Sequence, residues 1–143
     1  MENDATQRLL VEIGQLLAND TEYPLDGTLL YAELDHAMVA PSIFKNLGNH
    51  VLYRRPDLDT LGDALLDLWE AQDSKPRWVE IEYLIENGRF TATYTYPDEI
   101  DPNENENDMF ARTKRIVRKY FGDKPIVYPP LPPDDDDDPT YEL

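Results

Sequence analysis

The segment from Arg77 to Tyr96, RWVEIEYLIENGRFTATYTY, constrains the fold of this chain more than any other. Asn87-Gly88 separates two runs of alternating apolar and polar residues, which is the strongest short-range signal for a β-hairpin. A two-residue loop fixes the register by placing Glu86 opposite Arg89. The remaining predicted pairs are Ile85–Phe90, Leu84–Thr91, Tyr83–Ala92, Glu82–Thr93, Ile81–Tyr94, Glu80–Thr95 and Val79–Tyr96.

This register places nearly all apolar side chains of the hairpin on one face and nearly all polar side chains on the other. A slip of one residue would exchange the two faces, so the register is firmly specified. A one-sided antiparallel sheet has to cover its apolar face, and helices are the elements suited to do so. The sequence therefore predicts an α+β fold, with an antiparallel sheet of about five strands and helices packed on one face.

Apolar periodicity predicts three helices around the hairpin. The first covers residues 4–18, where leucine and isoleucine form one continuous stripe. The second covers Leu58–Gln72, and the third covers Met109–Phe121 and is closed by Gly122. Each helix therefore has an apolar side available for packing.

Three further strands are expected before the second helix, at Thr28–Asp35, His36–Asn46 and Val51–Arg55. Turn residues separate them, so they are expected to form a meander that joins the hairpin in antiparallel fashion. Pro41 lacks a backbone N–H, which places the second of these strands at an edge or a bulge.

The chain divides by composition into a domain and a tail. At 143 residues it is long enough to bury a substantial core, expected within residues 1–125. Residues 126–143 contain five prolines and five consecutive aspartates, which exclude a helix or a central strand. The expected state of this Pro-rich acidic tail is polyproline or disorder.

Residue usage excludes several kinds of functional site. The absence of cysteine excludes disulfides and thiolate chemistry. The two histidines, His36 and His50, are isolated, and no phosphate-binding loop, zinc motif or serine elbow is present. Oxygen-bearing side chains at positions 98, 101, 103, 105 and 107 loosely resemble a calcium loop, but the required glycine and closing glutamate are missing. We therefore expect no enzyme, no cofactor and no metal site.

The N-terminus shows no secretory signal, and no apolar run approaches the ~20 residues that span a bilayer. We expect a soluble cytoplasmic protein. The net charge of −17 argues against nucleic acid and anionic membranes as partners, since both would repel the chain. It is compatible with a basic protein partner, or with solubility alone.

The charge is unevenly distributed along the chain. It is −15 over residues 1–107, +4 over residues 108–124 and −6 over residues 125–143. One interpretation is self-neutralisation, in which Asp134–Asp138 fold back onto Arg112, Arg115 and Lys119 of the third predicted helix. The other is that the acidic surface binds a basic partner, and both interpretations can hold for different acids.

A series of aromatic-rich motifs runs through the hairpin and the third predicted helix. In order they are Trp78, Asn87-Gly88, Phe90, Tyr94-x-Tyr96 followed by an acid, Phe110-x-Arg112 and Lys119-Tyr120-Phe121-Gly122. This order resembles the YezG-like family of bacterial immunity proteins. These are cytosolic antitoxins of polymorphic or contact-dependent toxin systems, and they protect the producing cell by binding the toxin domain. The resemblance implies a non-enzymatic protein that binds the C-terminal domain of a cognate toxin.

A nuclease is the expected toxin class, because its basic cleft would attract an acidic protein and give salt-sensitive binding. The alternative is an intracellular adaptor whose Pro-rich tail binds a groove in another protein. Candidate contacts lie on the polar hairpin face, in the loop after the hairpin and in the tail, where a solvated surface is the competing interpretation. The candidate partner-binding residues are Glu80, Glu82, Asp98, Glu99, Asp101, Glu104, Glu106, Asp134, Asp135, Asp136, Asp137 and Asp138.

Overall fold

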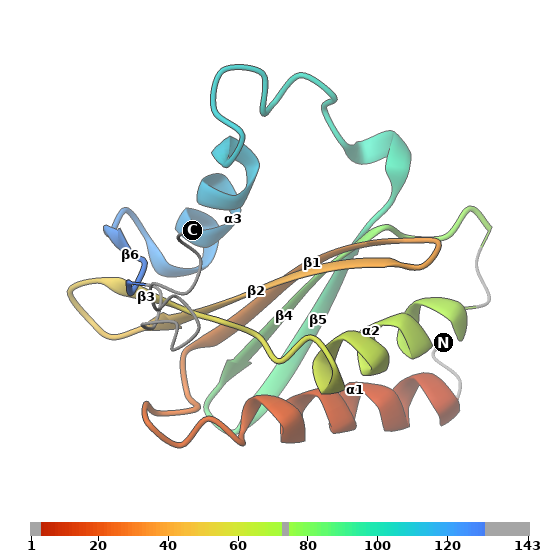
Figure 1. The fold of residues 1–143 in the computed structure, drawn as a ribbon, viewed down its shortest axis with the longest axis horizontal. Coiled ribbons are helices and arrows are strands. Elements are labelled where there is room, and N and C mark those ends of the chain that lie inside the picture. The colour runs from red at the N-terminus through yellow and green to blue at the C-terminus, as the bar shows by residue number, and fades with distance from the viewer. Residues whose placement is uncertain (1–3, 73–74, 131–143) are drawn as a thin grey trace, which may run out of the picture.

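Six strands form one mixed sheet in the computed structural model, which describes residues 4–72 and 75–130. In chain order the elements are α1 (Asp4–Leu17), β1 (Thr28–Asp35), β2 (Met38–Asn46), β3 (Val51–Arg54), α2 (Thr60–Glu70), β4 (Glu80–Glu86), β5 (Arg89–Thr95), the short 3-10 helix η1 (Pro97–Glu99), α3 (Ala111–Phe121) and β6 (Ile126–Val127). α1 and α2 lie together on one side of the sheet, and α3 lies on the other (Figure 1). The predicted α+β class is confirmed.

The central hairpin forms in the predicted register. All seven pairs from Glu86–Arg89 to Glu80–Thr95 are those that a two-residue loop requires. Asn87 and Gly88 adopt φ angles of 57° and 75°, the left-handed conformation that matches the twist of the two strands. Local turn chemistry therefore determines the pairing of β4 with β5.

The strands are ordered β5-β4-β1-β2-β3-β6 across the sheet. The expected meander is β1-β2-β3, and β1 joins the hairpin by antiparallel pairing with β4. β3 pairs only with Ile43–Asn46 of β2. At Pro41, therefore, β2 is paired with β1 on one side and with no strand of the described chain on the other. Its missing N–H therefore breaks no ladder on that side, as expected for an edge position.

The first core lies between the apolar face of the hairpin and the helices α1 and α2. Tyr83 at its centre is fully buried, and its hydroxyl donates to the Leu10 carbonyl at 2.7 Å. Trp69 of α2 donates from its indole N–H to the Trp78 carbonyl, also at 2.7 Å. These bonds satisfy the polar atoms of large buried side chains, so the aromatic residues also fix how the helices sit on the sheet.

A second core forms on the opposite face, under α3. Ile116, Val117 and Phe121 pack there against buried residues of the sheet, among them Leu29 and Phe44. The inner strands β1 and β2 carry apolar residues on both faces, a pattern typical of strands covered on both sides. The prediction placed helices on one face only, so this second layer is a finding of the tertiary structure.

The sheet extends past the domain boundary expected at residue 125. Ile126 belongs to β6, which pairs in parallel with β3, and its side chain packs against the second core. The ring of Tyr128 lies 5.2 Å from that of Tyr53. Contacts with the sheet and the second core therefore continue as far as Tyr128, while residues 131–143 of the predicted tail, with Asp134–Asp138, lie outside the described residues.

Candidate partner-binding surface

The structure corrects the expectation that the polar face of the hairpin meets solvent. Glu80 and Glu82 are only 3% and 4% exposed, because α3 crosses this face of the sheet. Side chains of α3 reach both carboxylates, as two ion pairs show. These two candidate residues are therefore withdrawn from the surface that a partner can reach while α3 is in place.

Arg112 of α3 neutralises Glu80. Its Nη2 donates to Glu80 Oε1 at 2.7 Å and its Nε donates to Glu80 Oε2 at 3.0 Å, a bidentate arrangement. The guanidinium also donates from Nη1 to Glu104 Oε1 at 3.0 Å. The hydrogen bond with Glu80 is the main cause that raises the pKa of Arg112. The charge on both sides is paired and hydrogen-bonded, which is the condition for burying it.

The second buried carboxylate, Glu82, accepts from Lys119 Nζ at 2.7 Å and from the Tyr120 hydroxyl at 2.6 Å. Glu104 likewise binds Arg115 as well as Arg112, and the hydrogen bond from Arg115 lowers its pKa. The basic residues of α3 therefore neutralise acids of the hairpin and of the following loop. The predicted pairing with Asp134–Asp138 lies outside the described residues.

The loop of residues 97–108, called the acidic loop below, rises above the sheet on the side of α3 (Figure 1). Hydrogen bonds from its own side chains hold it. Glu99 Oε1 accepts from the Tyr96 N–H at 2.8 Å, and Asn105 Oδ1 accepts from the Arg112 N–H at 2.9 Å. Several side-chain oxygens of the loop are thus engaged in shaping its backbone. The candidate residues that it leaves exposed are Asp98, Glu99, Asp101 and Glu106.

Two apolar side chains follow the acidic loop at the surface. Met109 is 72% exposed and Phe110 is 51% exposed. The sequence predicted both as packed residues of a helix from Met109, but α3 begins at Ala111, and Asp108 Oδ1 accepts from the Phe110 N–H in the preceding turn. Exposed apolar side chains bordered by charged ones are typical of protein-binding surfaces.

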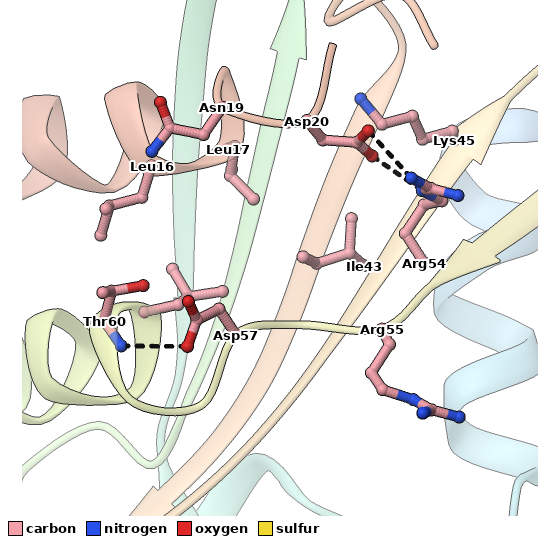
Figure 2. A pocket seen from close by; sticks show the side chains of 11 residues that line it. Leu16, Leu17, Asn19, Asp20, Ile43, Lys45, Arg54, Arg55, Asp57 and Thr60 are labelled. Atoms are coloured by element: carbon pink, nitrogen blue, oxygen red, sulfur yellow. Dashed lines mark hydrogen bonds and ion pairs between the residues drawn. The ribbon is translucent and has the colours of Figure 1, made fainter. Parts of the chain in front are cut away.

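A pocket of about 300 Å³ lies between the end of α1 and the start of α2 (Figure 2). Arg54 donates there to both carboxylate oxygens of Asp20, at 2.7 and 2.9 Å. Lys45 is 1% exposed, and its Nζ donates to the Pro24 carbonyl and the Thr28 hydroxyl. Burial is the main cause that lowers the pKa of Lys45. These cations contact atoms of the chain itself, so we assign them a structural role.

A further acidic surface, which sequence reasoning did not single out, lies on α2. Its side chains are exposed, recur at about one helical turn, and have no basic residue in the last turn to offset them. The four-residue spacing was visible in the sequence and marks one helix face. The members of this acidic ridge are Asp59, Asp63, Asp67 and Glu70.

No protein-family model and no curated protein sequence matches this chain. The resemblance of Trp78–Gly122 to immunity proteins therefore stays a prediction. In the described part of the chain, no three His, Cys, Asp or Glu side chains are grouped to hold a metal ion. Across the same residues, no helix has both the length and the apolar character needed to cross a membrane.

Proposed function

We propose that this protein is an immunity protein that binds a cognate bacterial toxin domain in the cytoplasm and neutralises it by occlusion, without catalysis. A nuclease is the proposed toxin class. One observation carries the proposal: the acidic loop is held by its own hydrogen bonds, those of Glu104 among them, and the exposed side chains of Met109 and Phe110 follow it directly.

The conformation of the acidic loop favours binding. Glu104 joins it to Arg112 and Arg115, and Asn105 joins it to the first turn of α3. A loop that is already ordered loses less conformational entropy when it meets a partner. Met109 and Phe110 then provide an apolar centre, around which the acids form a charged rim.

The charge of the loop suits a nuclease. A nuclease cleft must be basic to hold phosphates, and carboxylates at Asp98, Asp101 and Glu106 would take the place of those phosphates. Attraction between opposite charges also speeds the encounter. Glu80, Glu82 and Glu104 contribute indirectly in this proposal, because their ion pairs hold α3 and the loop.

The test begins with the toxin domain encoded next to this protein, produced together with it. We expect the two to co-purify, the nuclease activity to be lost in the complex, and the affinity to fall as salt rises from about 0.05 M to about 0.5 M. Neutralising the loop with Asp101→Asn and Glu106→Gln is expected to weaken binding about tenfold or more. The matched control, Asp67→Asn with Glu70→Gln on α2, removes the same charge elsewhere and should leave the affinity nearly unchanged.

Failure of the two proteins to associate, with full toxin activity retained, would contradict the immunity function. Affinity that does not change with salt would contradict the electrostatic mechanism alone. Equal losses from the loop variant and the α2 variant would show that net charge, rather than this surface, determines binding.

A further inference from the structure

A groove of about 410 Å³ lies beside the acidic loop, where the sheet emerges from under the start of α3. Strands β1, β2 and β3 form its floor, and the residues just before α3 form one wall. Aromatic rings dominate its lining, and one carboxylate, from Glu33, reaches it. The residues that define this aromatic groove are Tyr31, Glu33, Tyr53, Phe110 and Tyr128.

Glu33 has no counter-charge. It lies directly opposite Glu80 in the pairing of β1 with β4, and two like charges in such positions repel. Arg112 neutralises Glu80. Across residues 4–72 and 75–130, no ion pair is formed by Glu33, which is neither fully buried nor fully exposed. One carboxylate of the pair is therefore compensated by α3 and the other is not.

Tyr31 does not resolve this imbalance. Its hydroxyl lies 2.9 Å from Glu80 Oε2 and 3.3 Å from Glu33 Oε2, and a single proton serves the closer acceptor best. Burial, followed by the charges of Glu80 and Glu33, raises the pKa of Tyr31, so the hydroxyl keeps its proton. Glu33 thus receives at most a long hydrogen bond from within the groove.

The rings around Glu33 suit a cation. The ring centres of Tyr53 and Tyr128 lie 5.2 Å apart, and Tyr128 and Phe110 are each 51% exposed, so a ligand can reach these side chains. Aromatic faces attract cations, and a carboxylate beside them adds a full counter-charge. A flat guanidinium can stack on a ring and at the same time donate hydrogen bonds from its edge to a carboxylate, which an ammonium cannot do.

We infer that the aromatic groove receives an arginine side chain of the protein partner, with Glu33 as its counter-ion and the rings of Tyr53, Phe110 and Tyr128 as its walls. The identity of the partner rests on the proposed function. The chemistry of the groove does not, since it follows from Glu33 and the rings alone. The partner-binding surface would thereby consist of the groove, which holds one arginine of the partner, and the acids of the neighbouring loop.

The direct test uses a blocked tripeptide, acetyl-Gly-Arg-Gly-amide, titrated into the whole protein and followed by NMR. We expect saturable shifts of the signals of Ser42, Tyr53 and Phe110, which line the groove. The same peptide with neutral citrulline in place of arginine should produce no such shifts. Shifts located on the acidic loop or the acidic ridge alone would overturn the inference.

Variants separate the groove from general charge attraction. Glu33→Gln should weaken peptide binding about tenfold, whereas Glu86→Gln, the same change at the exposed end of the hairpin, should leave it unchanged. Phe110→Ala changes an exposed wall residue and should also weaken binding, so the test does not depend on one variant. Equal binding by Glu33→Gln, Phe110→Ala and the unchanged protein would overturn the inference.

The toxin domain distinguishes the two proposals. Binding of the arginine peptide in the groove without any binding of the toxin would support the groove and contradict the immunity function. Toxin binding that is unaffected by Glu33→Gln and Phe110→Ala, with no peptide shifts in the groove, would support the immunity function and contradict the arginine groove. Loss of both peptide and toxin affinity in these two variants is the expected result.

Discussion

At the scale of single residues, α3 and the acidic loop depend most on the buried ion pair of Arg112 with Glu80. Both side chains are almost fully buried, at 6% and 3% exposure. The arginine contacts carboxylates of the hairpin and of the acidic loop at once. Its removal leaves a buried charge without compensation, which costs far more than an exposed pair contributes.

Replacement of Arg112 by methionine is therefore expected to lower the free energy of unfolding by about 3–5 kcal/mol, because Glu80 stays buried and unpaired. The measurement is urea denaturation followed by circular dichroism. Addition of Glu80→Gln to this variant should restore a large part of the loss. Lys114→Met is the control: its pair with Asp108 is roughly half exposed, so we expect the free energy of unfolding to stay nearly unchanged.

Lys45 gives a prediction for pH dependence. Burial lowers its pKa in the folded state, so between the folded and unfolded pKa values the unfolded chain binds more protons. Its contribution to stability should therefore improve as pH rises toward the unfolded-state pKa of about 10. Over this range, the free energy of unfolding of the natural chain should rise relative to that of the Lys45→Met variant. Parallel pH profiles of the two proteins would contradict this expectation.

At the scale of secondary-structure elements, the neighbours of a helical glycine decide whether a larger residue fits in its place. Gly14 of α1 and Gly62 of α2 both lie inside helices, where glycine is ordinarily unfavourable. A β-carbon at Gly14 would lie 2.7 Å from the Tyr83 hydroxyl. A β-carbon at Gly62 would meet Val39 Cγ1 at 3.4 Å, an ordinary contact.

Gly14→Ala is accordingly expected to destabilise the protein by about 1–3 kcal/mol, since it displaces the buried Tyr83 and its bond to Leu10. Gly62→Ala should stabilise it by about 0.5–1 kcal/mol through helix propensity. Thermal unfolding of the two variants side by side provides the check. Stabilisation by both substitutions would show that α1 moves away from the sheet to accept the methyl group at Gly14.

Two cores on opposite faces of one sheet hold the whole molecule together. The first joins α1 and α2 to the hairpin, and the second joins α3 and Ile126 to the inner strands. The second core depends on the last strand, because β6 pairs with β3 and brings Ile126 against it. The position at which the chain is cut should therefore decide whether the fold survives.

Removal of residues 133–143 is expected to leave the melting temperature unchanged, because both described cores are built from earlier residues. Removal of residues 126–143 takes away β6 and the ring of Tyr128 as well, and should cost about 2 kcal/mol or more. Melting curves of the two truncated chains test this difference. A large loss from the shorter truncation would mean that the acidic tail supports the fold.

Much of the fold follows from the sequence alone. The hairpin register, the meander and the positions of α1 and α2 agree with predictions from alternation, helical periodicity and the Asn87-Gly88 turn. These features are local, because each depends on residues within one or two elements. The loop at residues 97–108 was predicted from its acidic, Asn-rich composition, and Asp98, Asp101 and Glu106 are exposed in it.

Only the tertiary structure decided that the polar hairpin face is buried and where the aromatic groove lies. Glu80 and Glu82 alternate with apolar residues as solvated side chains do, yet partners 32 and 37 residues away bury them. The same helix leaves Glu33 uncompensated, since Arg112 reaches Glu80 and not its neighbour across the strands. Periodicity specifies which face a side chain occupies, whereas what covers that face depends on contacts between distant segments.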